Sequence, residues 1–189
     1  MFSSALWVVI ETVGGLLASA CVLRVWGRWA RVHPRDPLLV FASALTDWLV
    51  QPFQRVVPSV RGVDWASALA ALLLAMLLLL IQYLLFGDLE HPERAPALGT
   101  ILIAAILRLA RWLLVMLLVT TIVQAVLSWV NPYSPFAPAL GQLTRPFLEP
   151  IRRRLPLIGG VDLAPLVLIL LVQFLLTLID RTLPLLGLA

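Results

Sequence analysis

The sequence predicts an all-α integral membrane protein with four transmembrane helices in two parallel repeats, each with a cytoplasmic amphipathic helix at the membrane interface. Three observations lead to this fold class: the composition, an internal duplication and the distribution of arginine. Hydrophobic residues fill 61% of the 189 positions and charged residues only 13%, against about 25% charged in soluble domains. A soluble domain of this length could not bury so much apolar surface, so the chain is predicted to cross a membrane several times.

The duplication is visible in the segment 45–66, which recurs without a gap at 143–164, an offset of 98 positions from its first residue (45 to 143). Upstream, Trp26 aligns with Trp129 when five residues are removed from the second loop. A period near 100 residues is too long for a solenoid repeat and fits two copies of one membrane hairpin. The identical pairs at the constant offset are Leu45 and Leu143, Thr46 and Thr144, Pro52 and Pro150, Arg55 and Arg153, Pro58 and Pro156, Gly62 and Gly160, Val63 and Val161, Asp64 and Asp162, and Ala66 and Ala164.

The duplication divides the chain into a first module, residues 1–95, and a second module, residues 96–189. The third apolar run is longer than a span needs and holds Arg108 and Arg111 near its start. We therefore interpret residues 97–110 as a lead-in at the membrane interface, with one long tilted helix as the alternative. The predicted spans are residues 4–26 and 65–86 in the first module, and 112–130 and 163–183 in the second.

Arginine is concentrated in the two segments that join the spans within each module, whereas the loop between the modules is acidic. The positive-inside rule places both arginine-rich segments in the cytoplasm and both termini outside. The run Arg152-Arg153-Arg154 is predicted to contact anionic lipid, and each such arginine contributes on the order of 1 kcal/mol. No nucleic-acid partner is predicted, because three arginines beside a membrane helix are ordinary.

An amphipathic segment lies between the spans of each module, at residues 38–57 and 137–155. An apolar face with Trp or Phe opposite a polar face with Arg is typical of a helix that lies in the membrane interface. Pro52, Pro146 and Pro150 each remove an N–H donor, so we expect these helices to be kinked or broken. The apolar faces carry Leu45, Trp48, Leu49, Phe53 and Val56 in the first segment, and Leu140, Leu143, Phe147, Leu148, Ile151 and Leu155 in the second.

The repeated block ends in Gly-x-Asp directly before an apolar span, which predicts a tight corner. The carboxylates of Asp64 and Asp162 can cap the helix that follows. Pro165 fits the first helical turn, and Gly62 permits a left-handed backbone. The paired glycines and Pro165 make the second corner the more constrained one, and a polar binding role for the two aspartates is the alternative. The motif and corner residues are Pro58, Gly62, Asp64, Thr144, Pro146, Pro150, Arg152, Arg153, Pro156, Gly159, Gly160, Asp162 and Pro165.

Polar residues inside the spans are the remaining candidates. Glu11 lies in the first span at the level where Arg108 and Arg111 enter the membrane, and an intramembrane carboxylate is usually paired or functional. Gln124 belongs to a row of polar residues along the third span, and Gln173 belongs to a similar row along the fourth; we call these rows polar stripes. Such stripes most often join helices by hydrogen bonds, and lining a polar pathway is the alternative.

No catalytic, cofactor or metal site is predicted. The sequence has no glycine-rich phosphate loop, no nucleophile elbow and no paired histidines, and Cys21 is its single cysteine. The composition and motifs therefore favour a protein that is not an enzyme.

The block from Leu143 to Pro165, which follows Ser128-Trp129, resembles the YggT/YlmG family. The first copy resembles the same module, but it lacks the proline after Thr46 and has Ser67 where the second copy has Pro165. The resemblance covers most of the chain and implies the two-module bacterial form, a multi-pass protein of the bacterial inner membrane with both termini in the periplasm.

What is known of the YggT/YlmG family implies roles of three kinds: osmotic-stress tolerance and potassium uptake, cell division and shape, and, in plastid relatives, nucleoid distribution and assembly of the cytochrome b6f complex. These roles share the theme of a small membrane scaffold that presents interfacial helices to partners, and this is the function that we predict first. The partner would be another membrane protein or a further copy of the chain. A component of ion or osmotic homeostasis is the alternative.

Overall fold

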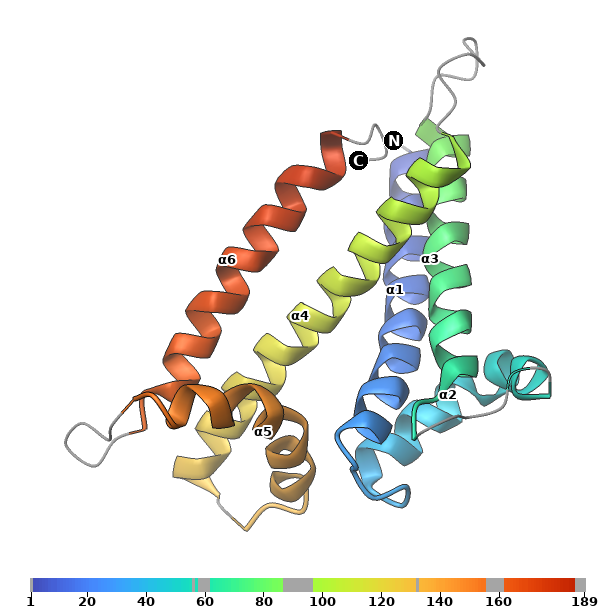
Figure 1. The fold of residues 1–189 in the computed structure, drawn as a ribbon. Helices are drawn as coiled ribbons and strands as arrows, with labels where there is room; N and C mark the ends of the chain where they lie inside the picture. The colour runs from blue at the N-terminus through green and yellow to red at the C-terminus, as the bar shows by residue number, and fades with distance from the viewer. Residues whose placement is uncertain are drawn as a thin grey trace.

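The computed structural model describes residues 2–55, 57, 62–86, 97–131, 133–155 and 162–185, and this part of the chain contains six α-helices. Figure 1 shows that the two short helices lie at one end of the molecule, whereas both termini lie at the opposite end. A long helix, a short helix and a long helix follow one another twice along the chain. The helices are α1 (Phe2–Trp29), α2 (Pro37–Gln54), α3 (Trp65–Phe86), α4 (Leu98–Val130), α5 (Ala137–Arg152) and α6 (Ala164–Leu185).

The four long helices, α1, α3, α4 and α6, are each long and apolar enough to cross a membrane. Each contains one of the four predicted spans, and together they identify a multi-pass membrane protein. The short helices α2 and α5 correspond to the two predicted amphipathic segments.

Helix α4 corrects the interpretation of residues 97–110, which are part of the third membrane helix and not a separate lead-in. No proline or glycine interrupts the sequence from Thr100 to Val130, so nothing breaks the helix. Its 33 residues correspond to about 50 Å at roughly 1.5 Å per residue, more than the roughly 30 Å hydrocarbon core. The helix can lie within a bilayer only if it is tilted, and Figure 1 shows α4 running obliquely across α1 and α3.

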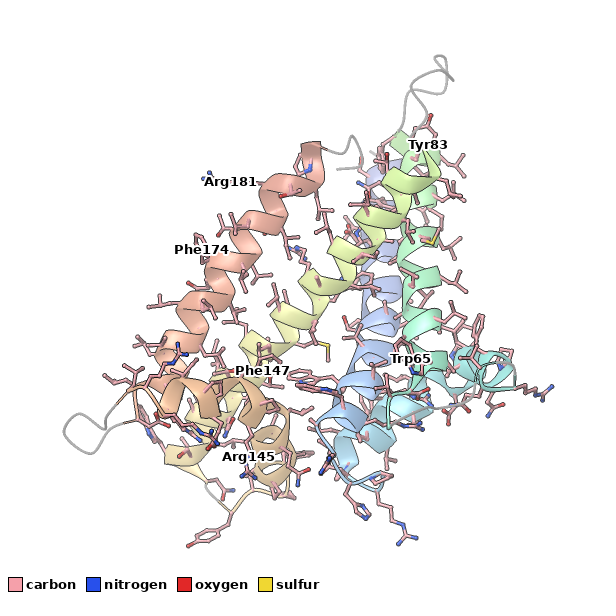
Figure 2. All side chains as sticks on the ribbon, viewed as in Figure 1. Trp65, Tyr83, Arg145, Phe147, Phe174 and Arg181 are labelled. Atoms are coloured by element: carbon pink, nitrogen blue, oxygen red, sulfur yellow. The ribbon has the colours of Figure 1, made fainter. Side chains whose placement is uncertain are left out.

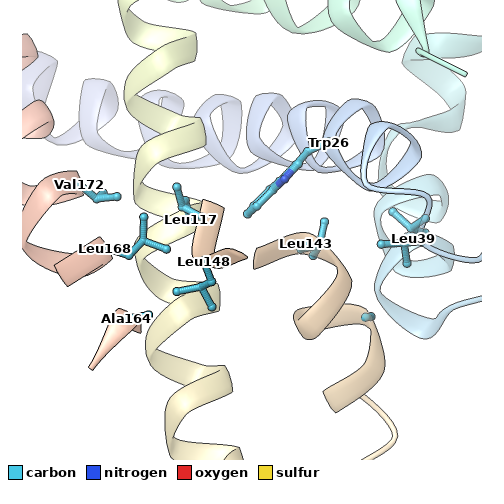
Figure 3. Packing of buried hydrophobic residues seen from close by; sticks show 10 residues of the cluster. Trp26, Leu39, Leu117, Leu143, Leu148, Ala164, Leu168 and Val172 are labelled. Atoms are coloured by element: carbon cyan, nitrogen blue, oxygen red, sulfur yellow. The ribbon is translucent and has the colours of Figure 1, made fainter. Parts of the chain in front are cut away.

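The amphipathic helix α5 packs its apolar face onto protein, where we expected membrane. Leu143 and Leu148 are buried in a cluster with side chains of α1, α4 and α6 (Figure 3). The Phe147 ring lies 6.2 Å from the Trp26 ring, between centroids, and 6.1 Å from the Trp29 ring. The helix also continues through its two interior prolines, Pro146 and Pro150, without a break. Burial against the long helices therefore contributes to holding α5 in place.

Helix α2 is bonded at its start and buried along one face. Asp36 caps it by accepting a hydrogen bond from the N–H of Leu38 at 3.0 Å, and Pro37 occupies the first turn, where no intrahelical N–H bond is lost. Its buried residues are Leu39, Ala42, Thr46 and Val50. The neighbouring apolar residues Phe41, Leu45 and Trp48 are exposed.

Candidate functional site

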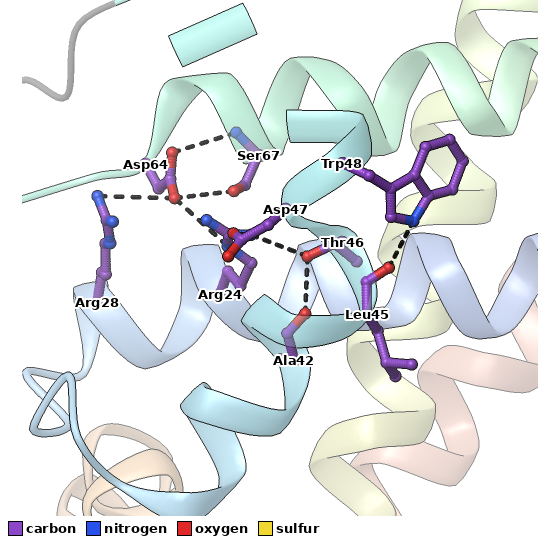
Figure 4. Close-up of polar contacts among 9 residues, drawn as sticks. All are labelled: Arg24, Arg28, Ala42, Leu45, Thr46, Asp47, Trp48, Asp64 and Ser67. Carbon is purple, nitrogen blue, oxygen red and sulfur yellow. Dashed lines mark hydrogen bonds and ion pairs between the residues drawn. The ribbon is translucent and has the colours of Figure 1, made fainter. Parts of the chain in front are cut away.

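The most buried polar cluster lies at the first corner, where Asp64 precedes α3 (Figure 4). The side chain of Asp64 accepts hydrogen bonds from the N–H of Ser67 at 3.2 Å and from the Ser67 hydroxyl at 2.8 Å. Its Oδ2 atom also lies 3.8 Å from the Arg24 guanidinium and 3.6 Å from that of Arg28. Asp64 is only 1% exposed, so it acts both as a helix cap and as one half of a buried ion pair.

Arg24 connects three helices at this corner. Its Nη1 atom donates hydrogen bonds to the hydroxyl of Thr46 at 2.9 Å and to Oδ1 of Asp47 at 2.7 Å, both on α2. Together with the contact to Asp64, these bonds join α1, α2 and the start of α3. Arg24 belongs to the first of the two arginine-rich segments that indicate the orientation, and we assign it no other role from the sequence. Arg24 lies inside the apolar sequence of α1, and an arginine in such a position indicates that an anionic side chain is buried beside it.

The second corner has the same aspartate in a more open setting. Asp162 accepts a hydrogen bond from the N–H of Ala164 at 3.0 Å and pairs with Arg152, whose Nη2 lies 2.7 Å from Oδ2. Both partners of this pair are partly exposed, and the arginine comes from α5 instead of from a long helix. Among the described residues, Asp64 is therefore the more buried of the two aspartates, whereas the constraint expected from Gly159 and Gly160 lies outside the described residues.

Gln124 joins α4 to α5. Its side-chain oxygen contacts the hydroxyl of Thr144, which also lies within hydrogen-bond distance, 2.9 Å, of the Leu140 carbonyl oxygen. Thr144 is fully buried. This contact agrees with the prediction that the polar stripe of the third span joins helices.

A second group of charges lies toward the end of the molecule that holds the termini. Arg108 of α4 donates a hydrogen bond to the side-chain oxygen of Gln82 at 3.0 Å and pairs with Glu11 at 3.4 Å. On the same helix, Arg111 pairs with Asp180 of α6 at 2.7 Å. The pairing expected for Glu11 is thus present, and these contacts involve all four long helices.

Arginines surround a depression of about 850 Å³ at the end of the molecule that carries α2 and α5. Arg153 pairs with Glu149 at 3.4 Å, and Glu149 is the acidic residue among the lining side chains. Arg145 of α5 lies at the same end of the molecule (Figure 2). We call this feature the arginine-lined depression; its charged and polar lining residues are Arg31, Gln142, Arg145, Glu149, Arg153 and Arg154.

The other predicted site residues are placed as follows. Pro146 and Pro150 lie inside α5, and Pro165 lies in the first turn of α6. Gly62 adopts the left-handed backbone expected of it, with φ of 79°. Gln173 is exposed on α6. Pro58, Pro156, Gly159 and Gly160 lie outside the described residues.

No group of three His, Cys, Asp or Glu side chains that could hold a metal ion occurs in the described part of the chain. The polar clusters there contact side chains of neighbouring helices. Fold and clusters together define the class: a multi-pass membrane protein whose buried polar groups join its helices.

Comparison with known proteins identifies the family. The sequence model of the CCB3/YggT family matches residues 3–85 and 103–183. The chain is 32% identical over 164 residues to the uncharacterized protein YggT of Escherichia coli strain K12, covering 86% of this chain and 82% of that protein. It is 34% identical over 170 residues, 88% of each chain, to an uncharacterized protein of Vibrio alginolyticus. No solved structure matches the chain. The chain belongs to the CCB3/YggT family.

Proposed function

We propose that the protein is a non-enzymatic scaffold of the bacterial inner membrane that holds partner proteins at its arginine-lined depression. The observation that carries this proposal is the concentration of Arg31, Arg145, Arg153 and Arg154 around one depression, opposed by Glu149. The positive-inside rule favours a cytoplasmic position for this end of the molecule, with both termini in the periplasm.

The chemistry of the depression favours an acidic partner. Guanidinium groups bind carboxylates through two parallel hydrogen bonds, which gives them geometric specificity as well as charge. The depression is also next to the membrane surface, where anionic lipid headgroups would attract the same arginines. We therefore propose an acidic segment of a membrane protein as the partner, with anionic lipid around it.

Rigid support of α5 suits a scaffold. Leu143 and Leu148 anchor α5 in the core, and the contact between Thr144 and Gln124 ties it to α4. A surface that is already ordered loses little conformational entropy when a partner binds. The arginines on α5 are therefore presented on a fixed helix.

The test is affinity capture in mild detergent, with the wild type compared with the double variant Arg145→Gln and Arg153→Gln. Arg35→Gln is the matched control, because Arg35 is an exposed arginine outside the depression. We expect the double variant to reach normal protein levels, to lose the captured partner and to fail in a deletion strain, while the control behaves as the wild type. Normal capture and complementation by the double variant would exclude the depression as the binding surface.

A component of ion or osmotic homeostasis is the second candidate. It is favoured by the charges of Glu11, Arg108 and Asp180 between the long helices, since ionisable residues inside a membrane often mark ion pathways. In this case Arg108→Gln and Glu11→Gln should impair potassium uptake and growth under osmotic stress at normal protein levels, while Arg145→Gln with Arg153→Gln has little effect. The opposite pattern favours the scaffold.

A further inference from the structure

The two halves of the chain dock through unlike surfaces. The first half, α1 to α3, contributes Trp26 of α1 and the buried residues Ala75 and Leu79 of α3. The second half, α4 to α6, contributes Ala139, Leu143 and Phe147 of α5, which cluster with Trp26, and a pair of buried alanines of α4 that cluster with Ala75 and Leu79. We call the surface on the first half the donor face and the surface on the second half the acceptor face.

The duplication gives the residues of these faces on α1, α3 and α5 a counterpart in the other half. Residues of α2 and α3 correspond to those of α5 and α6 at the offset of 98 positions, and α1 corresponds to α4 through Trp26 and Trp129. Packing within each half agrees with this correspondence: Gly14 lies directly against Leu78, and their counterparts Leu117 and Leu176 belong to one cluster. Buried and exposed counterparts can therefore be compared directly.

The counterpart of the donor face is uncovered on the second half. Trp26 is 4% exposed, whereas Trp129 is 84% exposed. The counterparts of the buried Ala75 and Leu79 are Gln173 and Thr177 of α6, and both are exposed. The second half therefore carries a free donor face.

Only part of the counterpart of the acceptor face is uncovered on the first half. Leu49, the counterpart of Phe147, is partly buried against residues of the first half, but the counterparts of Ala139 and Leu143 are exposed. Ala139 of α5 is 1% exposed, and its counterpart Phe41 of α2 is 64% exposed. Leu143 packs beneath Trp26 (Figure 3), whereas its counterpart Leu45 is exposed. Figure 1 shows α2 and α6 on opposite sides of the bundle, so the two free faces do not cover each other.

This asymmetry excludes a two-fold relation between the halves. A two-fold axis would repeat the contact of Trp26 with Phe147 as a contact of Trp129 with Leu49, and Trp129 would then be covered. The two halves therefore dock through a heterologous interface, in which two different faces meet. Such an interface leaves one donor face and one acceptor face of the chain unused.

Gln173 indicates that lipid is a poor cover for the free donor face, whereas the Thr177 hydroxyl is satisfied by the backbone carbonyl of Gln173 at 2.9 Å. Gln173 is the tenth residue of the 22-residue α6, near the middle of the span. An amide there finds no hydrogen-bond partner in hydrocarbon, and polar side chains within spans usually contact another helix. The counterpart of Gln173 is Ala75, which another helix covers inside this chain.

We propose that a second copy of this chain covers these faces. The free donor face of one copy, with Trp129 and Gln173, docks on the free acceptor face of the next copy, with Phe41 and Leu45, and repeats the contact that joins the halves of one chain. The assembly closes into a ring when successive rotations return to the first copy. This interface is separate from the arginine-lined depression, so the proposal is independent of the proposed function.

Two differently tagged chains in a Cys21→Ser background test the proposal in membranes. One chain carries Trp129→Cys and the other carries Leu45→Cys, and a short bismaleimide reagent is added. We expect a cross-linked product that contains both tags, and no product when either chain is expressed alone. The control Trp48→Cys changes an exposed neighbour on α2 whose counterpart, Pro146, is also exposed, and it should give much less product.

Three outcomes would overturn the proposal. Cross-linking of Trp129→Cys to a second Trp129→Cys chain would indicate a two-fold dimer, and cross-linking of Trp129→Cys to Trp48→Cys as strong as that to Leu45→Cys would show that the contact is not specific. The third is no mixed product between the two chains while the positive control, Trp26→Cys with Phe147→Cys in one chain, reacts. Counting wild-type copies in native-lipid nanodiscs by stepwise photobleaching adds a measurement free of substitutions. Two or more copies per particle support the proposal, and single copies contradict it.

Discussion

Replacing Asp64 by Asn removes one negative charge from the buried corner and leaves the shape of the side chain unchanged. The amide oxygen can still accept the hydrogen bond from Ser67, so the helix cap is kept. The loss falls on Arg24, which is buried and would retain Asp47, at 2.7 Å, as its anionic partner among the described residues. The cost of the substitution is therefore electrostatic.

The size of the effect follows from burial. Removing one member of a buried ion pair costs about 3–5 kcal/mol when the other member is left alone. Because Arg24 keeps Asp47, we expect a smaller loss, of about 2 kcal/mol, for Asp64→Asn, which is within the range for hydrogen bonds to charged groups. Asp64→Ala also removes the cap, which adds about 1 kcal/mol. The exposed pair at the second corner is worth only about 0–1 kcal/mol, so Asp162→Asn should change stability little.

Cys21 provides the assay, because it is the single cysteine and is fully buried beside this corner. A fluorogenic maleimide reports its exposure as the detergent-solubilised protein is heated. At roughly 2–4 °C per kcal/mol for a chain of this size, Asp64→Asn should lower Tm by about 4–8 °C. If Asp162→Asn lowers Tm as much as Asp64→Asn does, the buried network is not the stabilising feature that we describe.

Three further outcomes are expected. Phe147→Glu should lower Tm strongly, because it places a charge against Trp26. Phe147→Leu should reduce the free energy of unfolding by less than about 1.5 kcal/mol. Equal effects of the two substitutions on Tm would contradict the packing of α5. Cysteine at Tyr133, which is 95% exposed, should resist an impermeant thiol reagent added from the periplasm, whereas cysteine at Ala97, exposed directly before α4, should react. The reverse pattern would invert the orientation. Gly62→Ala should cost about 1 kcal/mol, because φ is 79° there and no atom lies near an added methyl group; an unchanged Tm would mean that the turn relaxes without cost.

Much of the fold could be predicted from local sequence. The four spans, the two short helices and the two aspartate corners follow from runs of apolar residues and from turn residues, each of which acts within a few positions of the chain. The error at residues 97–110 has a clear cause. Arg108 and Arg111 suggested an interface, but Gln82, Glu11 and Asp180, which lie far away in the sequence, contact these arginines from the neighbouring long helices.

By itself, the sequence determined that this is a multi-pass membrane protein with a duplicated hairpin, because helix length, hydropathy and repetition are properties of contiguous residues. Only the tertiary structure showed which of two matching residues is covered. Asp64 and Asp162 occupy equivalent positions of the duplication, as do Trp26 and Trp129 in the gapped alignment, yet one of each pair is buried and the other is not. Burial depends on which surfaces of the two halves meet, and docking through unlike surfaces gives equivalent residues different neighbours.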